Sequence, residues 1–337
     1  MTGEAALNSR AETLGTVAVV VLAYGGGQEC VPLVSGLAAS GRIASERITV
    51  VHNPSRPGET LGLDVGLPVN VIDSATNVGY TGGMNLGIEW SRTLGASAVL
   101  LLTHEVRIDV ETIEILCAAL DRHPEYGAVA PVLFTRDGRP YSLGHQKLGR
   151  ASFVHRTAVD SDLGDEPLPA ASLDGSVMLW RSEALYALGG FDSRFFMYYE
   201  DIDICARAHR EGWSTGVILG TQAATSPGGS RRPAAHAYLR TRNGLEYARK
   251  AGGLTFAFAL WGLLRDLWNH SPKPGGTRFR DPDARAAARA YRRGFRWGIV
   301  DFVRRRWGPP PAALLRQTDI WVTSAASGNV RPVDHLP

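Results

Sequence analysis

Three acidic residues stand close together near the middle of the chain: Glu200, Asp201 and Asp203. An aromatic cluster over residues 191–199 precedes them, and apolar residues at i, i+1 and i+4 predict that they begin a helix ending near Gly212. Acids at a helix N-terminus lie against the positive end of the helix dipole, so we expect them to stay ionised. An ionised carboxylate in an aromatic-walled site can act as a general base. The plainer interpretation is that these acids only cap a helix.

The residues that could accompany such a base follow four apolar runs, which read as buried strands at residues 17–24, 48–51, 69–72 and 98–102. Helical patterns lie between and after them, at residues 31–37, 84–94 and 110–120. This alternation is typical of a doubly wound α/β sheet, whose ligands bind beyond the carboxyl ends of its strands. Residues 77–85 are predicted to form a glycine-rich loop that leads into a helix and offers backbone N–H groups to phosphate.

The stretch from Asp174 to Trp213 reads DGSVMLWRSEALYALGGFDSRFFMYYEDIDICARAHREGW. It closely resembles the acceptor-side motif of family-2 glycosyltransferases with the GT-A fold, and most of all their rhamnosyltransferase-like branch. The resemblance implies a Rossmann-like, mostly parallel sheet flanked by helices, with a helical C-terminal extension. In that family the second acid of the Glu-Asp pair deprotonates the acceptor hydroxyl. That role would fall to Asp201, with Glu200 beside it and Asp203 and Arg207 as supports.

A second motif of the same family lies in the first half of the chain, at Asn77, Gly79, Tyr80, Gly82, Gly83, Asn85 and Gly87. The resemblance implies that it lines the nucleotide-sugar site, with Ala23 and Tyr24 at the nucleoside-binding turn. The residues that it assigns to the nucleotide sugar are Ala23, Tyr24, Asn53, Asn77, Gly79, Tyr80, Gly83, Asn85, Thr103 and His104. Those that it assigns to the acceptor or the diphosphate are Asp174, Gly175, Arg240 and Arg242.

The chain departs from the family pattern at two places. The family has an acid before Asn53 that accepts the pyrimidine N3–H, where this chain has His52, a residue that can accept a hydrogen bond through one ring nitrogen. The family's metal motif, D-x-D or N-x-D, is replaced by Thr103, His104 and Glu105.

Three interpretations of the changed metal motif stay open. Glu105 and His104 hold Mg²⁺ or Mn²⁺, which prefer hard oxygen ligands and phosphate oxygens. Alternatively, Arg231, Arg232 and Arg240 neutralise the diphosphate without metal, or the chain is a non-catalytic sugar-nucleotide-binding homologue. The family's histidine near the end of the domain is also missing, and His236 is a candidate substitute.

The gross composition narrows the class of protein. The chain has 337 residues and a net charge of +3, which is too small to indicate a nucleic-acid partner. Cys30, Cys117 and Cys205 are far apart and lack metal-ligand spacing, so they favour a reducing compartment. The apolar runs are too short for a signal peptide or a spanning helix. We therefore expect a cytoplasmic protein that is at most peripheral to the inner face of the membrane.

The C-terminal part combines aromatic residues with positive charge. Residues 254–270 form an aromatic-rich amphipathic segment, and residues 284–307 carry eight arginines. This composition favours either an anchor on an anionic membrane or a helical pair packed on the catalytic domain or on the second subunit of a homodimer. We expect a disordered N-terminus at 1–15, a catalytic domain at 16–250 with halves near 16–131 and 132–250, helices at 251–310, and a tail at 311–337. His145 and His155, within the loop-rich segment 132–172, are expected to be surface residues.

The predicted function is inverting transfer of a sugar from a nucleoside-diphosphate sugar to a hydroxyl acceptor. By resemblance the donor is dTDP-rhamnose, with a UDP-hexose as the competitor. The acceptor is a lipid-linked saccharide or a small natural product.

Overall fold

We analysed a computed structural model, which describes residues 14–63, 68–149, 152–158, 166–226, 233–269 and 282–315. Its main sheet has the strand order β3-β2-β1-β4-β10-β5-β11-β9, with β6 paired to β5. The strands are β1 (Val17–Tyr24), β2 (Ile48–Asn53), β3 (Asn70–Asp73), β4 (Ala98–Thr103), β5 (Tyr126–Thr135), β6 (Pro140–Ser142), β9 (Leu168–Pro169), β10 (Val177–Arg181) and β11 (Ser214–Thr225). The first four strands in this order are parallel, and β10 runs antiparallel to both of its neighbours. The four strands expected from the sequence are confirmed, as is the mostly parallel sheet.

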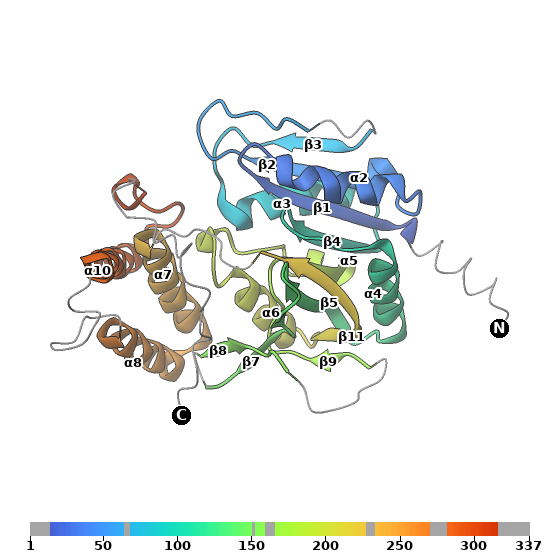
Figure 1. Cartoon of the computed structure of the whole chain (residues 1–337). Coiled ribbons are helices and arrows are strands. Elements are labelled where there is room, and N and C mark those ends of the chain that lie inside the picture. Colours follow the sequence, from blue (N-terminus) through green and yellow to red (C-terminus); the bar gives the residue numbers. More distant parts are fainter. Residues whose placement is uncertain are drawn as a thin grey trace.

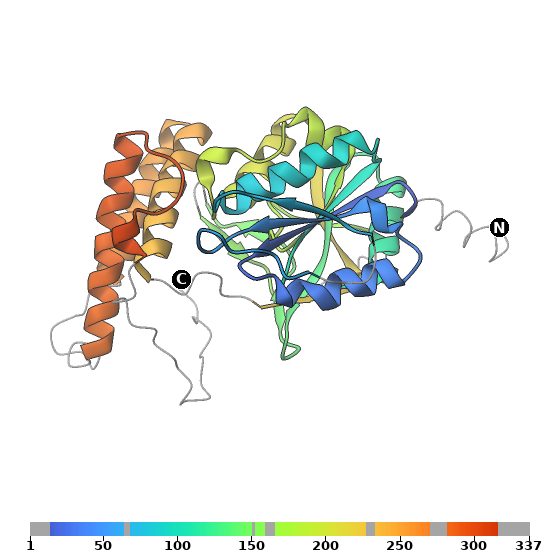
Figure 2. The same cartoon turned by 90° about the horizontal axis from the view of Figure 1, so that it is seen from above.

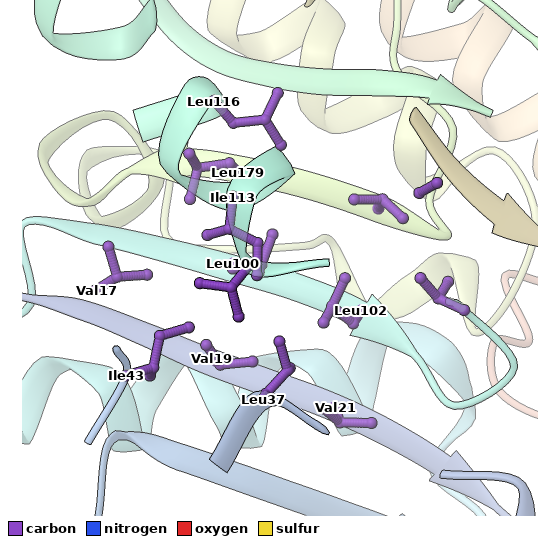
Figure 3. Packing of buried hydrophobic residues seen from close by; sticks show 14 of the residues in the cluster. Val17, Val19, Val21, Leu37, Ile43, Leu100, Leu102, Ile113, Leu116 and Leu179 are labelled. Carbon is purple, nitrogen blue, oxygen red and sulfur yellow. The ribbon is translucent and has the colours of Figure 1, made fainter. Parts of the chain in front are cut away.

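Helices cover both faces of the sheet because its central strands are apolar on both sides (Figures 1 and 2). Val17, Val19 and Val21 of β1 pack with α2 (Val31–Ala39) and α4 (Val110–Arg122), as Figure 3 shows. Val20 and Leu22 point to the other face, into a cluster with α3 (Gly79–Thr93) and α6 (Glu200–Arg210). The short helix α5 (Ser182–Ala187) joins the same cluster.

The prediction of a glycine-rich loop at 77–85 is wrong in one respect, because α3 already begins at Gly79. Its glycines serve close packing. A Cβ on Gly83 would come within 2.3 Å of Leu22, and one on Gly87 within 2.1 Å of Val20, both on β1. The helix can lie this close to the sheet only without side chains at these positions.

The segment between β5 and β10 forms a hairpin, β7 (His145–Lys147) and β8 (Phe153–His155), which pairs residue for residue. Gly144 precedes it with φ +76°, and a Cβ there would lie 2.7 Å from the Cβ of Ala170. The hairpin is therefore held against the main sheet.

Three helices stand beside the sheet: α7 (Pro233–Ala251), α8 (Gly253–Asn269) and α10 (Pro282–Val303) (Figures 1 and 2). Gly294 and Gly298 of α10 let it approach α7, since a Cβ at either position would come within 2.7 Å of a backbone oxygen of α7. Phe256 of α8 stacks on Phe302 of α10, with ring centroids 5.8 Å apart. Among the described residues, no helix is both long enough and apolar enough to cross a bilayer.

Candidate active site

Four carboxylates gather around the buried ring of Tyr80, near the start of α3. Its hydroxyl donates a hydrogen bond to the carbonyl oxygen of Gly175, with an O–O distance of 2.6 Å. Burial raises the pKa of Tyr80 well above its usual range, and the negative charges of Glu200, Asp201, Asp174 and Glu105 raise it further. The two sequence motifs and the end of β4 therefore meet at one place, although they are far apart in the chain.

The loop that delivers Glu200 and Asp201 is conformationally strained. Phe196, Tyr198 and Tyr199 have φ values of 57°, 71° and 73°. Side chains disfavour this region, at a cost on the order of 1–3 kcal/mol per residue. The amide of Asn243 on α7 holds the loop by donating to the carbonyl oxygens of Phe195, Met197 and Tyr198 at 2.6–2.9 Å. A helix outside the sheet thus sets the position of the candidate base.

The surroundings of Glu200 and Asp201 oppose the expectation that these two acids stay ionised. Burial raises the pKa of Asp201 to about 7, and the charge of Asp174 adds to this increase. Burial also raises the pKa of Glu200 well above its usual value, with Asp201 contributing. One carboxylate oxygen of Glu200, Oε2, is buried and has no hydrogen-bond partner among the described residues. Loss of hydration outweighs the helix dipole here, and it favours the protonated form of both Asp201 and Glu200.

Asp203 and Arg207 are placed as supports for this turn. Arg207 Nε donates to Asp203 Oδ2 at 2.9 Å, and the same guanidinium donates to the carbonyl oxygens of Leu188 and Gly190. Lys250, near the end of α7, pairs with the other oxygen of Asp203. These contacts hold α6 between the Gly189–Gly190 turn and α7.

The side-chain amides of Asn53 and Asn77, in the nucleotide half, bond mainly to the backbone. Asn53 accepts from the N–H of Val78 at 2.9 Å and donates to Asn77 Oδ1 and to the carbonyl of Gly79. Asn77 also accepts from the N–H of Gly79 at 2.9 Å. This network fixes the end of β2 against the start of α3. Ala23 is buried in β1, whereas Tyr24, at the end of that strand, is exposed.

Gly79 and Asn85 connect the two halves of the site. Gly79 has φ +75°, and a Cβ there would lie 2.4 Å from the carbonyl oxygen of Phe196 in the strained loop. Asn85 donates to the carbonyl of Phe191 at 2.8 Å and accepts from its N–H at 2.9 Å. In the structure, Gly83 therefore lets α3 pack closely against β1, and Asn85 holds the backbone of Phe191.

His52 cannot accept a hydrogen bond from a base as the sequence suggested. It is buried, its Nε2 lies 3.0 Å from the carbonyl oxygen of Gly25, and its Nδ1 lies 2.8 Å from Asp73 Oδ1. Both ring nitrogens are therefore occupied. The exposed carboxylate at this edge belongs to Asp73 of β3, which pairs with His52 in register.

The residues after β4 include two donors that suit a divalent cation. His104 Nδ1 lies 3.3 Å from Glu105 Oε2, and both side chains are about one-fifth exposed. The neighbouring Thr103 hydroxyl is buried without a partner among the described residues. No group of three or more His, Cys, Asp or Glu side chains suited to a metal occurs in the described part of the chain. A cation here would rely on phosphate oxygens for its remaining ligands, as Mg²⁺ commonly does.

The two predicted arginines of α7 have different surroundings. Arg242 is fully buried, and it donates to Tyr238 Oη at 3.0 Å and to the carbonyl of Gly308 at 2.8 Å. It therefore joins α7 to the segment after α10 and is not available to a diphosphate, which corrects the prediction for this residue. Arg240 is exposed, and its positive charge partly offsets the rise that burial causes in the pKa of Tyr198. Arg231 and Arg232 lie outside the described residues.

The sequence analysis missed two residues of this region. His145 is buried rather than on the surface, and His155 is half-buried, with the two ring centroids 4.2 Å apart. Burial lowers the pKa of each, and the charge of Asp174 opposes that shift in both. The only sequence signal was the short spacing between them, because their contact depends on the hairpin register.

Comparison with known proteins agrees with this arrangement. Residues 9–244 match the family model described as Glycosyltransferase like family 2. The chain is 31% identical over 151 residues to the low-salt glycan biosynthesis hexosyltransferase Agl10 of Haloferax volcanii, an alignment that covers 44% of this chain and 48% of the relative. It therefore spans about half the length of that relative.

Two further proteins are similar over longer stretches. The N-acetylglucosaminyl-diphospho-decaprenol L-rhamnosyltransferase of Mycobacterium tuberculosis is 28% identical over 221 residues, covering 58% of this chain and 71% of the relative. The crystal structure of GalNAc-T7 with UDP, GalNAc and Mn²⁺ superposes with a TM-score of 0.53 at 12% identity, covering 77% of this chain and 59% of that one. The structural likeness concerns the fold alone.

Proposed function

The chain belongs to the Glycosyltransferase like family 2, and we propose that it transfers a sugar from a nucleoside-diphosphate sugar to a hydroxyl group with inversion at the anomeric carbon. The observation that most supports this is the convergence of Asp201, Glu200, Asp174 and Glu105 around Tyr80. It joins a candidate base and a candidate diphosphate site at one end of the sheet.

In the proposed reaction, Asp201 takes the proton of the acceptor hydroxyl while that oxygen attacks the anomeric carbon from the face opposite the nucleotide. The bond from this carbon to the diphosphate breaks, and the nucleoside diphosphate leaves with the electron pair. A base works best when its pKa lies near the working pH, and the pKa of Asp201, raised to about 7, meets that condition. Glu200 is buried, and burial favours its protonated form, so we assign it the role of an uncharged neighbour.

The diphosphate that leaves needs positive charge beside it. Glu105 and His104 would hold Mg²⁺ or Mn²⁺ together with phosphate oxygens, since they are adjacent, partly exposed and near Tyr80. When bound, such a cation supplies positive charge to the developing diphosphate. In the metal-independent alternative, Arg240 takes over part of this role from its exposed position on α7.

The proposed donor is dTDP-rhamnose, with a UDP-hexose as the alternative, because the Mycobacterium relative is named a rhamnosyltransferase and the Haloferax relative a hexosyltransferase. The name of the Mycobacterium relative includes a sugar on diphospho-decaprenol. A lipid-linked saccharide is therefore the proposed acceptor, and a small natural product is the alternative.

A direct test measures binding first and turnover second. Thermal unfolding of the purified chain is recorded with a panel of sugar nucleotides, with and without Mn²⁺, because a ligand of the native state raises Tm. We expect dTDP-rhamnose to give the largest rise and to yield a rhamnosylated product with a polyprenyl-diphosphate GlcNAc acceptor, detected by mass spectrometry. Donor binding without transfer to any lipid-linked or soluble acceptor would instead identify a non-catalytic sugar-nucleotide-binding homologue.

A surface of α8 and α10, which we call the apolar face, supports a role at a membrane. Large apolar side chains are concentrated there, and Trp261 and Val303 are about 70% exposed. The members of the apolar face are Leu254, Phe258, Leu260, Trp261, Leu264, Trp297, Val300 and Val303. Exposed apolar side chains gathered in this way indicate an interaction site.

The charges around the apolar face favour an anionic lipid surface as its partner. Arginines recur along α10 and continue after it in the exposed run Arg304–Arg306, whereas α8 carries one arginine, Arg265. The two helices contain three acidic residues, Asp266, Asp283 and Asp301, of which Asp301 is buried and accepts a hydrogen bond from Tyr238 at 2.9 Å. We propose that the apolar face inserts into the headgroup region while the arginines contact anionic lipid, which would bring the site to a lipid-linked acceptor.

We expect the double variant Phe258→Glu, Trp261→Glu to bind vesicles of phosphatidylcholine and phosphatidylglycerol at least about tenfold more weakly, because charged side chains resist insertion. Co-sedimentation with vesicles measures this, and the matched control is Leu86→Glu, an exposed apolar residue on α3. If the unmodified chain does not bind these vesicles and sediments as a dimer in ultracentrifugation, the apolar face is a contact between two copies.

A further inference from the structure

A cavity of about 330 Å³, which we call the arginine pocket, lies at the end of α10 beside the apolar face. Its volume falls within the range of ligand pockets, which is roughly 300–1,000 Å³. Its lining includes three arginines and three apolar side chains: Arg194, Arg249, Arg305, Phe302, Val303 and Trp307. Val303 belongs to both the arginine pocket and the apolar face, so the two surfaces are continuous. None of these residues takes part in the proposed reaction.

Two of the three arginines are held by one buried carboxylate, that of Glu246 on α7. Arg249 donates to both of its oxygens at 2.7 Å, and Arg194, in the short helix η3 (Ser193–Phe195), donates to Oε1 at 2.5 Å. The Glu246 side chain is 1% exposed, whereas those of Arg194 and Arg249 are 37% and 51% exposed. A guanidinium group has five N–H donors, so both arginines are fixed in orientation and keep donors for a further anion.

The third arginine, Arg305, occupies a backbone position that favours glycine. Its φ is +52°, in the left-handed region, and its N–H donates to the carbonyl oxygen of Phe302 at 3.1 Å in the turn that ends α10. Its exposed side chain forms no hydrogen bond or ion pair with any residue that the structure describes. The turn therefore places a free guanidinium group at the pocket, at a position where a side chain is conformationally costly.

The charges of the arginine pocket suit a phosphate group. Three guanidinium groups and the Glu246 carboxylate line it, which leaves an excess of two positive charges. Asp192, which also binds Arg194, is paired with Lys250 at 2.8 Å and does not cancel this excess. A phosphate monoester carries about −1.5 to −2 charges at pH 7, and its oxygens match the donors of guanidinium groups.

We propose that the arginine pocket binds the terminal phosphate of a membrane lipid, whose hydrocarbon chains then lie along the apolar face. Charge complementarity and the shared residue Val303 favour a phosphate carried by a lipid over a free anion. This inference rests on the membrane role proposed for the apolar face. It adds a site for one head group to the general attraction between arginines and an anionic surface.

The test is co-sedimentation with phosphatidylcholine vesicles that contain either phosphatidic acid or phosphatidylglycerol, adjusted to the same zeta potential. Phosphatidic acid has a terminal phosphate, and phosphatidylglycerol does not. We expect the unmodified chain to bind the phosphatidic acid vesicles at least about tenfold more tightly, the scale of one or two charge-assisted hydrogen bonds. In Arg305→Gly this preference should fall below about threefold. Glycine suits the φ of +52°, so the Tm of this variant should not fall.

The matched control is Arg306→Ala, which removes the same charge from the neighbouring exposed position outside the pocket lining. Both variants should lose binding to phosphatidylglycerol vesicles to a similar extent, up to about fivefold, because each lacks one arginine near the surface. Arg306→Ala should keep the full preference for phosphatidic acid. A preference that survives in Arg305→Gly, or that is lost equally in both variants, would overturn the proposal.

A second measurement does not require vesicles. Soluble dihexanoyl phosphatidic acid should raise the Tm of the unmodified chain and of Arg306→Ala, and it should not raise that of Arg305→Gly. An equal rise with inorganic phosphate would identify a site for a soluble anion and contradict the lipid assignment. If the unmodified chain binds both kinds of vesicle equally, the membrane role stands and the arginine pocket has no part in it. If it binds neither, the membrane role itself fails, so the two failures are distinguishable.

Discussion

Asp201→Asn is expected to lower kcat for sugar transfer by about 10³-fold, since general base catalysis contributes on the order of 10²–10⁴. The amide has nearly the same shape as the carboxyl group but cannot accept the acceptor proton. The Asp201 side chain also accepts a hydrogen bond from the N–H of Ile202 at 2.8 Å, which the amide oxygen can maintain. Donor binding, measured by thermal shift, should therefore survive. Transfer at close to the parent rate would remove Asp201 from the role of base.

Glu200→Gln is the matched control because it lies next to Asp201 at the same helix start. Burial favours the protonated form of Glu200, and glutamine resembles that form. We expect kcat to fall by less than about tenfold, in contrast to the loss expected for a general base. If both variants lost activity equally, the two acids would act as one unit, and the assignment of the proton to Asp201 alone would be wrong.

Removal of divalent cations with EDTA is expected to reduce transfer by at least about 100-fold, because the leaving diphosphate then lacks its counter-charge. Added Mn²⁺ or Mg²⁺ should restore the rate. Glu105→Gln should show a comparable loss and need a much higher cation concentration for recovery, since Glu105 supplies the carboxylate after β4. The measurement is the initial transfer rate against free cation concentration.

Glu89→Gln serves as the control for this experiment, since Glu89 is an exposed acid on α3 paired with Arg92. It should respond to EDTA and to added cation as the unmodified chain does. Transfer that EDTA leaves unchanged would favour neutralisation by side chains. Arg240→Met should then be severely impaired, as Arg240 is the exposed arginine beside Tyr198.

The parts of the fold that depend on residues close together in the sequence could be predicted from the sequence. The run at 17–24 is apolar at nearly every position, and it forms β1 at the centre of the sheet, buried on both faces. The helix that starts at Glu200 also follows from local spacing. The start of α3 did not, because Gly79 and Gly83 indicate a loop unless Phe196 and Leu22 are known to lie against that segment. Contacts with residues 117 and 61 positions away in the sequence decided this boundary.

The candidate site shows the same division. The chain's order of residue types was enough to single out Asp201, Glu200 and Glu105 and to predict that the strand ends share one edge. It was not enough to place Arg242, whose burial between α7 and the segment after α10 depends on how those helices pack. Nor did it reveal that Asp73 of β3 lies beside His52.

The amino-acid sequence by itself determined which groups this protein can use, a set of carboxylates behind apolar strands, and the family to which it belongs. Only the tertiary structure decided their chemistry. Burial and the approach of Asp174 set the protonation of Asp201, and the hairpin register brought His145 onto His155. The physical reason is that hydration and charge–charge interactions depend on distance in space, and residues far apart in the chain acquire those distances only when it folds.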